Sequence, residues 1–240
     1  MPTVGVISLG CSKNRVDTES MLGFLSEAGY KIISAPEKAD ILIVNTCGFI
    51  ESAKQESINT ILEMAQYKKD ANCKVLAVTG CLSQRHRKEL IEELPEVDVF
   101  LGVSEYHKLV PELNKFFKMD CSEVFSGKRI LTTPFYTAYL RISDGCDNCC
   151  TYCAIPMIRG PRKSLEIEGL VREAEELAEQ GVRELVVIAQ DTSGYGLDTY
   201  KKPMLSELLL QLTSIDKLKW IRLLYTYPNT VDRKLIDTIA

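Results

Sequence analysis

The alternation of two hydrophobic patterns is the feature that most limits how this chain can fold. Short apolar runs, each long enough for one buried strand, cover residues 4–9, 41–44, 75–78 and 97–101. Amphipathic stretches with helical periodicity follow them at residues 20–28, 53–66, 84–93 and 108–117. A helix between consecutive strands makes those strands parallel and covers the faces of their sheet. The amino-terminal half is therefore predicted to be an α/β domain built on a parallel sheet.

The pattern lapses from residue 119 to 134, where Ser, Thr, Gly and Pro accumulate. Such a segment is typical of a connection between domains. We therefore predict a first domain over residues 1–125, a linker over 126–134 and a second domain over 135–240.

The second half repeats the alternation of strand and helix three times. Predicted strands cover residues 136–142, 184–189 and 220–225, and predicted helices cover 167–179, 204–212 and 231–240. Tandem units of this kind build (βα) barrels, but three units cannot close one. Because the chain also ends inside a predicted helix, we expect the first half of a truncated barrel.

Nine cysteines are the unusual part of the composition. A chain of 240 residues buries roughly 70% of its unfolded surface, so it needs no disulfide or metal merely to fold. The odd cysteine count and the absence of a signal segment after Met1 argue against a secreted disulfide scaffold and predict a cytoplasmic protein. No apolar stretch approaches the roughly 18 residues of a membrane span. The net charge of -4 is shared equally by the two halves, so neither is a basic surface for nucleic acid.

The densest cysteine group follows the first strand of the second half. Cys146, Cys150 and Cys153 have the spacing Cys-x3-Cys-x2-Cys. Three thiolates on one loop can bind three irons of a cubane cluster and leave the fourth iron open. A zinc knuckle would need a fourth ligand, and the nearest histidine, His107, lies far upstream. Cys149 also allows Cys-x2-Cys redox pairs, although four cysteines in one short loop favour a cluster.

A second cysteine group is dispersed in the sequence. Cys11, Cys47 and Cys81 each follow a predicted strand. Ligands bind at this carboxyl edge of open parallel sheets, so the three sulfurs converge if the three strands are neighbours. The alternative is that each is an ordinary buried cysteine, and this is the expected role of Cys73 and Cys121, which lack that placement.

Two polar loops lie at the same edges. Residues 12–14 follow Cys11 and are equally suited to cap a helix or to serve the site. Residues 190–196 follow the second strand of the predicted barrel, at the face where barrels bind ligands, and are expected to contact a cofactor.

These motifs together resemble the radical S-adenosylmethionine (SAM) methylthiotransferases. The cysteine loop with Tyr152 before its last cysteine is similar to the radical SAM signature, and the first domain is similar to the flavodoxin-like amino-terminal domain of the family. The matching segments are 9–14, 45–50, 80–85, 94–98, 141–148, 153–156, 190–192 and 195–196.

Within that family the motifs resemble the RimO branch, which modifies the β carbon of an aspartate in a small-subunit ribosomal protein. The tRNA-modifying MiaB branch usually has Gln-Met-Asn at residues 12–14 and an Arg-Glu pair at residues 49–51, where this chain differs. A tRNA enzyme acting on a modified adenosine beside the anticodon is the alternative. The resemblance covers nearly the whole chain and leaves the family's later barrel strands unaccounted for, so the fragment alone is expected to be inactive.

The resemblance implies two 4Fe-4S clusters and SAM as cofactors. The first cluster would be held by Cys11, Cys47 and Cys81. The second, which binds SAM at its open iron, would be held by Cys146, Cys150 and Cys153. The residues implied near SAM are Tyr152, Gln190 and Asp191.

The implied partners are a small-subunit ribosomal protein as substrate and a reductant protein such as flavodoxin or ferredoxin. No membrane is implied, and nucleic acid is needed only in the tRNA alternative. A non-catalytic electron carrier or zinc scaffold would not explain why both cysteine groups stop at three.

Overall fold

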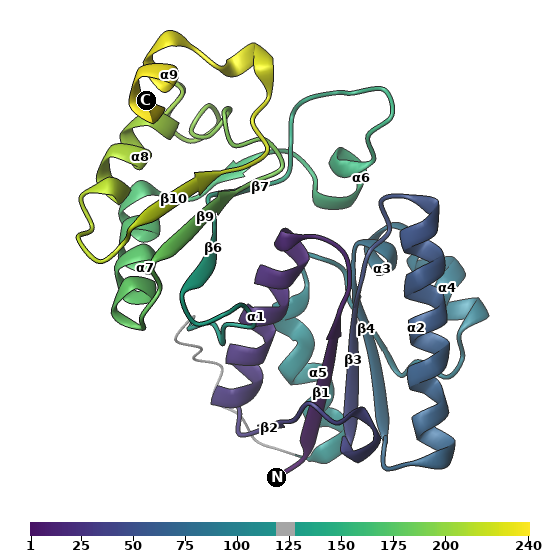
Figure 1. The fold of residues 1–240 in the computed structure, drawn as a ribbon. Coiled ribbons are helices and arrows are strands. Elements are labelled where there is room, and N and C mark those ends of the chain that lie inside the picture. Colours follow the sequence, from purple (N-terminus) through teal and green to yellow (C-terminus); the bar gives the residue numbers. More distant parts are fainter. Residues whose placement is uncertain (119–127) are drawn as a thin grey trace. The chain divides into compact units, whose positions relative to one another are not determined.

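A computed structural model of the chain describes residues 1–118 and 128–240 (Figure 1). It divides into two compact units, which are unit 1 (Met1–Ile130) and unit 2 (Leu131–Ala240). The first two residues of the predicted linker, and Cys121, lie outside the described residues. Within the described ranges no helix combines the length and the apolar character needed to cross a membrane.

Unit 1 is built on a five-stranded parallel sheet with the strand order β2-β1-β3-β4-β5. Its strands are β1 (Thr3–Ser8), β2 (Lys31–Ile32), β3 (Ile41–Thr46), β4 (Val75–Gly80) and β5 (Val99–Phe100). Its helices are α1 (Ser12–Glu27), α2 (Glu51–Asp70), α3 (Cys81–Arg85), α4 (Arg87–Glu93) and α5 (Leu109–Phe117), with short 3-10 turns η1 (Pro36–Lys38) and η2 (Tyr106–Lys108). This is the strand order of flavodoxin-like folds, so the predicted parallel α/β fold is confirmed.

Both faces of this sheet are covered. In β3, Ile41 and Ile43 pack into one core with α1 and α5, whereas Leu42 and Val44 pack into another with α2 and α4. A strand buried on both faces needs apolar side chains at successive positions, which explains the unbroken apolar runs in the sequence.

Two helices of unit 1 differ from the sequence prediction. Helix α1 begins at Ser12, well before residue 20, because its first turns bury polar side chains and therefore lack an amphipathic pattern. Lys13, Asn14 and Glu19 are among these buried polar residues. The helix predicted over 84–93 starts at Cys81 and is interrupted at His86, which separates α3 from α4.

Unit 2 contains a three-stranded parallel sheet with the order β10-β9-β6. Its main strands are β6 (Thr137–Arg141), β9 (Glu184–Ile188) and β10 (Trp220–Leu223), and a separate antiparallel pair joins β7 (Ser143–Asp144) to β8 (Lys163–Ser164). Its helices are α6 (Ile155–Arg159), α7 (Ile167–Glu179), α8 (Leu205–Thr213) and α9 (Arg233–Ile239), with the 3-10 turn η3 (Pro228–Thr230). Consecutive parallel strands pair side by side, as in the first units of a (βα) barrel, so the predicted partial barrel is confirmed.

Candidate functional sites

The three dispersed cysteines of unit 1 lie at one edge of its sheet. Cys11 follows β1 and immediately precedes α1, Cys47 follows β3, and Cys81 begins α3 directly after β4. Because β1 and β4 both pair with β3 in parallel, the three strands are neighbours and their carboxyl ends share an edge. The structure therefore meets the condition under which the sequence predicts that these cysteines converge.

Glycines allow the three cysteine-bearing segments to approach closely. Gly10 has φ +87°, and a Cβ atom added to it would lie 2.8 Å from the Cβ of Cys47. Gly80 has φ +98°, and an added Cβ would lie 2.4 Å from the carbonyl oxygen of Thr46. A Cβ atom added to Gly48 would lie 2.7 Å from the Cα of Leu82 in α3. Side chains at these positions would push the segments apart.

We expect Gly80→Ala to destabilise unit 1 by about 1–3 kcal/mol from backbone strain alone, with the clash against β3 adding to this cost. The measurement is urea unfolding followed by far-ultraviolet circular dichroism and by the fluorescence of Trp220, the single tryptophan, which lies in unit 2. The dichroism transition of unit 1 should move to lower urea, while the fluorescence transition stays in place.

The matched control for this prediction is Gly169→Ala in α7. An added Cβ there meets no atom within 4 Å, so the higher helix propensity of alanine should stabilise unit 2 by up to about 1 kcal/mol. An unchanged dichroism transition in Gly80→Ala would show that this close approach is not needed.

The cysteine loop of unit 2 connects β7 to α6. The backbone N–H of Cys146 donates to the carbonyl oxygen of Gly160 at 3.1 Å, and that of Cys153 donates to Cys150 at 3.0 Å. Cys146 is buried and Cys150 and Cys153 are half-buried, whereas Cys149 is exposed. Of the four cysteines of the loop, only Cys149 is therefore exposed to solvent.

A pocket of about 190 Å³ opens at this loop. Three cysteines line it, namely Cys146, Cys150 and Cys153, and Cys149 does not. The other lining residues are Asn148, Tyr152, Ile155, Gln190, Asp191, Tyr225, Thr226 and Tyr227. The three residues that the family resemblance implies near SAM, Tyr152, Gln190 and Asp191, thus line the same pocket as the three cysteines of the Cys-x3-Cys-x2-Cys motif.

Two tyrosines of this pocket have no role predicted from the sequence. Tyr225 and Tyr227 follow the carboxyl end of β10. Residues that follow the strands of a barrel commonly contact its ligand. The position of the two tyrosines at and just after the end of a predicted strand is therefore the sequence signal that could have identified them. Tyr225 also has φ +63°, a left-handed conformation that is uncommon for a bulky residue. Its carbonyl oxygen accepts a hydrogen bond from the backbone N–H of Thr192 at 3.0 Å.

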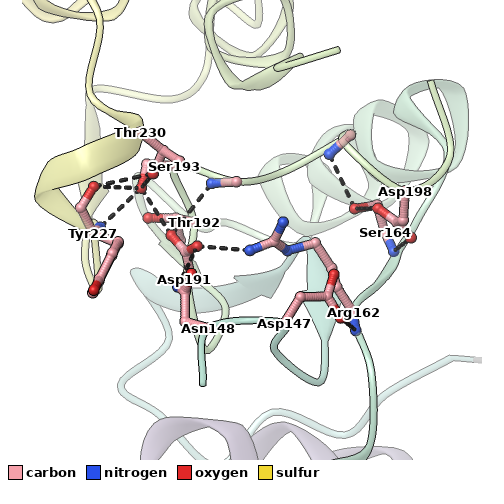
Figure 2. A network of polar contacts seen from close by, with 12 residues as sticks. Asp147, Asn148, Arg162, Ser164, Asp191, Thr192, Ser193, Asp198, Tyr227 and Thr230 are labelled. Atoms are coloured by element: carbon pink, nitrogen blue, oxygen red, sulfur yellow. Dashed lines mark hydrogen bonds and ion pairs between the residues drawn. The ribbon is translucent and has the colours of Figure 1, made fainter. Parts of the chain in front are cut away.

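Asp191 holds several segments around the pocket (Figure 2). Its Oδ2 accepts hydrogen bonds from Arg162 Nη2 at 2.7 Å and from Asn148 Nδ2 at 3.0 Å. Its Oδ1 accepts one from Ser193 Oγ at 2.8 Å. The side chains of Arg162 and Asp191 are only 4% and 2% exposed, so this is a buried ion pair. Asp191 thereby anchors Asn148, which lies inside the cysteine loop.

Ser193 extends this network to the segment after β10 (Figure 2). Its Oγ accepts a hydrogen bond from the backbone N–H of Tyr227 at 2.8 Å and lies 2.6 Å from Thr230 Oγ1. Asp191 and Ser193 therefore connect the cysteine loop, the loop after β9 and the segment after β10.

Gln190 lines the pocket and is held there by Asp144. Its Nε2 donates to Asp144 Oδ1 at 2.8 Å, while its Oε1 is buried and has no hydrogen-bond partner among the described residues. Burial, the largest influence, raises the pKa of Asp144, but the charges of Arg159 and Arg141 and its hydrogen bonds hold that pKa below the ordinary value. The anionic Asp144 therefore fixes the amide of Gln190 in the wall of the pocket.

The electrostatics of the pocket oppose negative charge. Burial raises the pKa of the Cys146 thiol, and the charges of Asp191 and Cys153 raise it further. The pKa of Tyr227 is raised mainly by the charge of the Cys150 thiolate. The backbone of Asn148 and the charge of Arg162 lower the pKa of Cys146 in part, but the net pKa stays above the ordinary value. A metal that binds these cysteines must therefore displace their protons.

Single metal ions and iron-sulfur clusters require different arrangements of ligands. In residues 1–118 and 128–240, no three His, Cys, Asp or Glu side chains are gathered around a position for a single metal ion. A cubane cluster requires ligands that lie farther apart from one another, because each cysteine binds a different iron. Three pocket-lining cysteines fit such a cluster with one iron open to a ligand.

Two family models match the chain. The model of the Uncharacterized protein family UPF0004 matches residues 3–102 in unit 1, and that of the Radical SAM superfamily matches residues 140–240 in unit 2.

Curated relatives with the name ribosomal protein uS12 methylthiotransferase RimO match over almost the whole chain. Identity is 53% with the Clostridium kluyveri protein, 52% with that of Clostridium botulinum strain Hall, and 50% with that of Thermoanaerobacter sp. strain X514. These matches cover 99%, 98% and 100% of this chain. The chain belongs to the radical SAM methylthiotransferase family. It spans only 55% to 57% of the length of these relatives.

Two solved structures of the radical S-adenosylmethionine methyltransferase TsrM from Kitasatospora setae share the fold. One, with cobalamin and a [4Fe-4S] cluster bound, has a TM-score of 0.65 and covers 99% of this chain and 56% of that chain. The other, with tryptophan and a SAM analog bound, has a TM-score of 0.66 and covers 100% and 57%. Both are 13% identical, which shows a common fold and no more.

Proposed function

We propose that this chain is part of a radical SAM methylthiotransferase that adds a methylthio group to the β carbon of an aspartate in ribosomal protein uS12. One observation carries the proposal. Cys146, Cys150 and Cys153 line a single pocket together with Gln190, and Cys149 is left outside. The names of the curated relatives support the substrate.

The pocket residues take separate roles in this proposal. Cys146, Cys150 and Cys153 would hold a 4Fe-4S cluster, and a TsrM structure of the same fold contains such a cluster. When bound, the cluster and SAM would supply the electron and the carbon-radical chemistry that an unactivated C–H bond requires.

The side chains around that cluster would orient the bound SAM. Gln190, held by Asp144, would form part of the wall against it, and the exposed ring of Tyr152 would cover the pocket entrance. Asp191 is occupied by Arg162, Asn148 and Ser193, so it would act by holding the walls of the pocket.

The cysteines of unit 1 would hold a second 4Fe-4S cluster. Cys11, Cys47 and Cys81 share one edge of the sheet, and this edge is the usual ligand site of the fold. An open iron there would carry the sulfur that is transferred, and a second SAM would supply the methyl group. The electron donor would be a flavodoxin-like or ferredoxin-like protein of the cytoplasm.

A tRNA methylthiotransferase is the competing function. A nucleic-acid substrate requires a surface rich in Lys and Arg, whereas the chain carries a net charge of -4. The curated relatives are named for a protein substrate, which favours the ribosomal protein.

The test uses the organism that encodes the chain. Cys150→Ala is introduced into the chromosomal gene, and uS12 from purified ribosomes and nucleosides from total tRNA are compared by mass spectrometry with the parent strain. Loss of one methylthio group from uS12, with unchanged tRNA, is the expected result. Loss from tRNA alone would replace the proposal with the competing function, and Cys149→Ala serves as the control that should change neither.

A further inference from the structure

Asn14 is a buried polar residue at the cysteine-bearing ends of the strands in unit 1. It lies in the first turn of α1, and its side chain is completely buried. Helix α1 begins after Cys11, whose side chain makes no capping hydrogen bond. The sequence left open whether Asn14 caps the helix or serves the site, and its contacts lead away from the helix.

The side chain of Asn14 reaches all three cysteine-bearing segments. Its Nδ2 donates to the carbonyl oxygen of Leu9 at 3.2 Å and to that of Thr46 at 2.8 Å. Leu9 precedes Cys11 by two residues, and Thr46 immediately precedes Cys47. Its Oδ1 accepts a hydrogen bond from the thiol of Cys81 at 3.4 Å. One amide group therefore bridges the ends of β1, β3 and β4.

Neighbouring groups fix Asn14 in this position. Its backbone carbonyl oxygen accepts a hydrogen bond from Asn45 Nδ2 at 2.8 Å. The same Nδ2 also donates to Thr18 Oγ1 at 2.9 Å, and Thr18 in turn donates to Ser8 Oγ at 2.9 Å. The first turns of α1 are thus tied to β1 and β3, so the amide cannot move away from the strand ends.

The chemistry of this contact set is specific to an amide. Only Asn and Gln carry two N–H donors and a carbonyl acceptor in one plane. Asp has nearly the same shape but would place a carboxylate oxygen against the carbonyl oxygens of Leu9 and Thr46. Ala would leave both carbonyl groups without this donor in a buried place.

From the two hydrogen bonds of its Nδ2 we infer that Asn14 is a positioning residue that sets the spacing of the segments of Cys11 and Cys47 for the cluster that these two cysteines share with Cys81. The contact with Cys81 is made by the protonated thiol, which loses that proton when it binds iron. The inference rests on the proposed function, because it assumes that these cysteines bind a cluster. Groups that orient metal ligands typically change metal affinity by about 10–100-fold when they are replaced. The same range is expected here.

The test isolates the cluster of unit 1. In the chain with Cys146, Cys150 and Cys153 all replaced by alanine, Asn14→Asp and Asn14→Ala are reconstituted anaerobically with ferrous iron and sulfide. The rate at which a chelator removes the iron is measured, and the electron paramagnetic resonance (EPR) spectrum of the reduced cluster is recorded. We expect both variants to lose iron about 10–100-fold faster per folded molecule and to show altered EPR spectra.

The matched control is Asn114→Ala in the same unit. Asn114 accepts a hydrogen bond from the hydroxyl of Tyr30 at 2.5 Å, and its replacement should leave iron retention and the EPR spectrum unchanged. Circular dichroism gives the folded fraction, and Asn14→Asp carries the test if Asn14→Ala does not fold. Retention equal to the control, or iron loss that only follows unfolding, would overturn the inference. Failure of the parent chain to load iron at this site would instead contradict the proposed function.

Discussion

Cys150→Ala should remove one cluster and leave the other. Anaerobic reconstitution of the parent chain should yield roughly eight irons per molecule, and the variant should yield roughly four, because each cubane cluster contains four. The reason is geometric, since Cys150 lines the pocket of unit 2 while the cysteines of unit 1 belong to a separate fold. The variant should also lose the change that SAM causes in the EPR spectrum of the reduced parent chain.

Cys149→Ala is the control that the loop itself provides. Cys149 is adjacent to Cys150 in the sequence but is exposed and does not line the pocket. Its replacement should leave both the iron content and the response to SAM unchanged. Equal iron loss in the two variants would show that the ligands are wrongly assigned. Roughly four irons in the parent chain would show that it holds one cluster only.

The sequence was sufficient to predict all the longer strands of the two parallel sheets and the edge at which the cysteines lie. The runs that became β3 and β4 are apolar at successive positions because both faces of the sheet are buried. Since consecutive strands are parallel, residues that follow them lie at one edge whatever the packing details. The placement of Cys11, Cys47 and Cys81 could therefore be predicted without knowing any contact.

The contacts that organise both sites could not be predicted in the same way. Arg162 and Asp191 are 29 residues apart, and Asn14 contacts Cys81 across 67 residues. No short sequence pattern predicts either contact, because the partners are far apart in the sequence. Only the folded chain determines which of the many polar side chains meet. The short elements β2, α6, β7 and β8 were missed for a related reason, since segments of two to five residues are too short to show a hydrophobic period.

The role of Asp191 changed most between sequence and structure. From the resemblance it was expected near SAM, and it does line the pocket. Its carboxylate, however, is already bonded to Arg162, Asn148 and Ser193. A residue with its oxygens so occupied acts on a ligand through the groups that it holds. This makes the buried ion pair a determinant of the shape of the pocket.

Removing Arg162 should therefore destabilise unit 2 strongly. Arg162→Met would leave the carboxylate of Asp191 buried without a counter-charge, and breaking a buried pair in this way costs about 3–5 kcal/mol. Gly194 makes room for the guanidinium, since a Cβ added there would lie 2.3 Å from Arg162 Nη2. Urea unfolding followed by Trp220 fluorescence reports on unit 2 alone and measures the change.

Two further variants separate the buried charge from the lost packing. In the double variant Arg162→Met with Asp191→Asn, no charge remains unpaired, so part of the lost stability should return. Arg233→Met removes the same side chain from the exposed ion pair with Asp237, where the expected cost is below about 1 kcal/mol. If Arg162→Met were no more destabilising than Arg233→Met, the pair would not hold unit 2 together. If Arg162→Met is the more destabilising variant, the hydrogen bond by which Asp191 anchors Asn148 is weakened as well. The cysteine loop should then load iron less completely, even at urea concentrations where unit 2 is still folded.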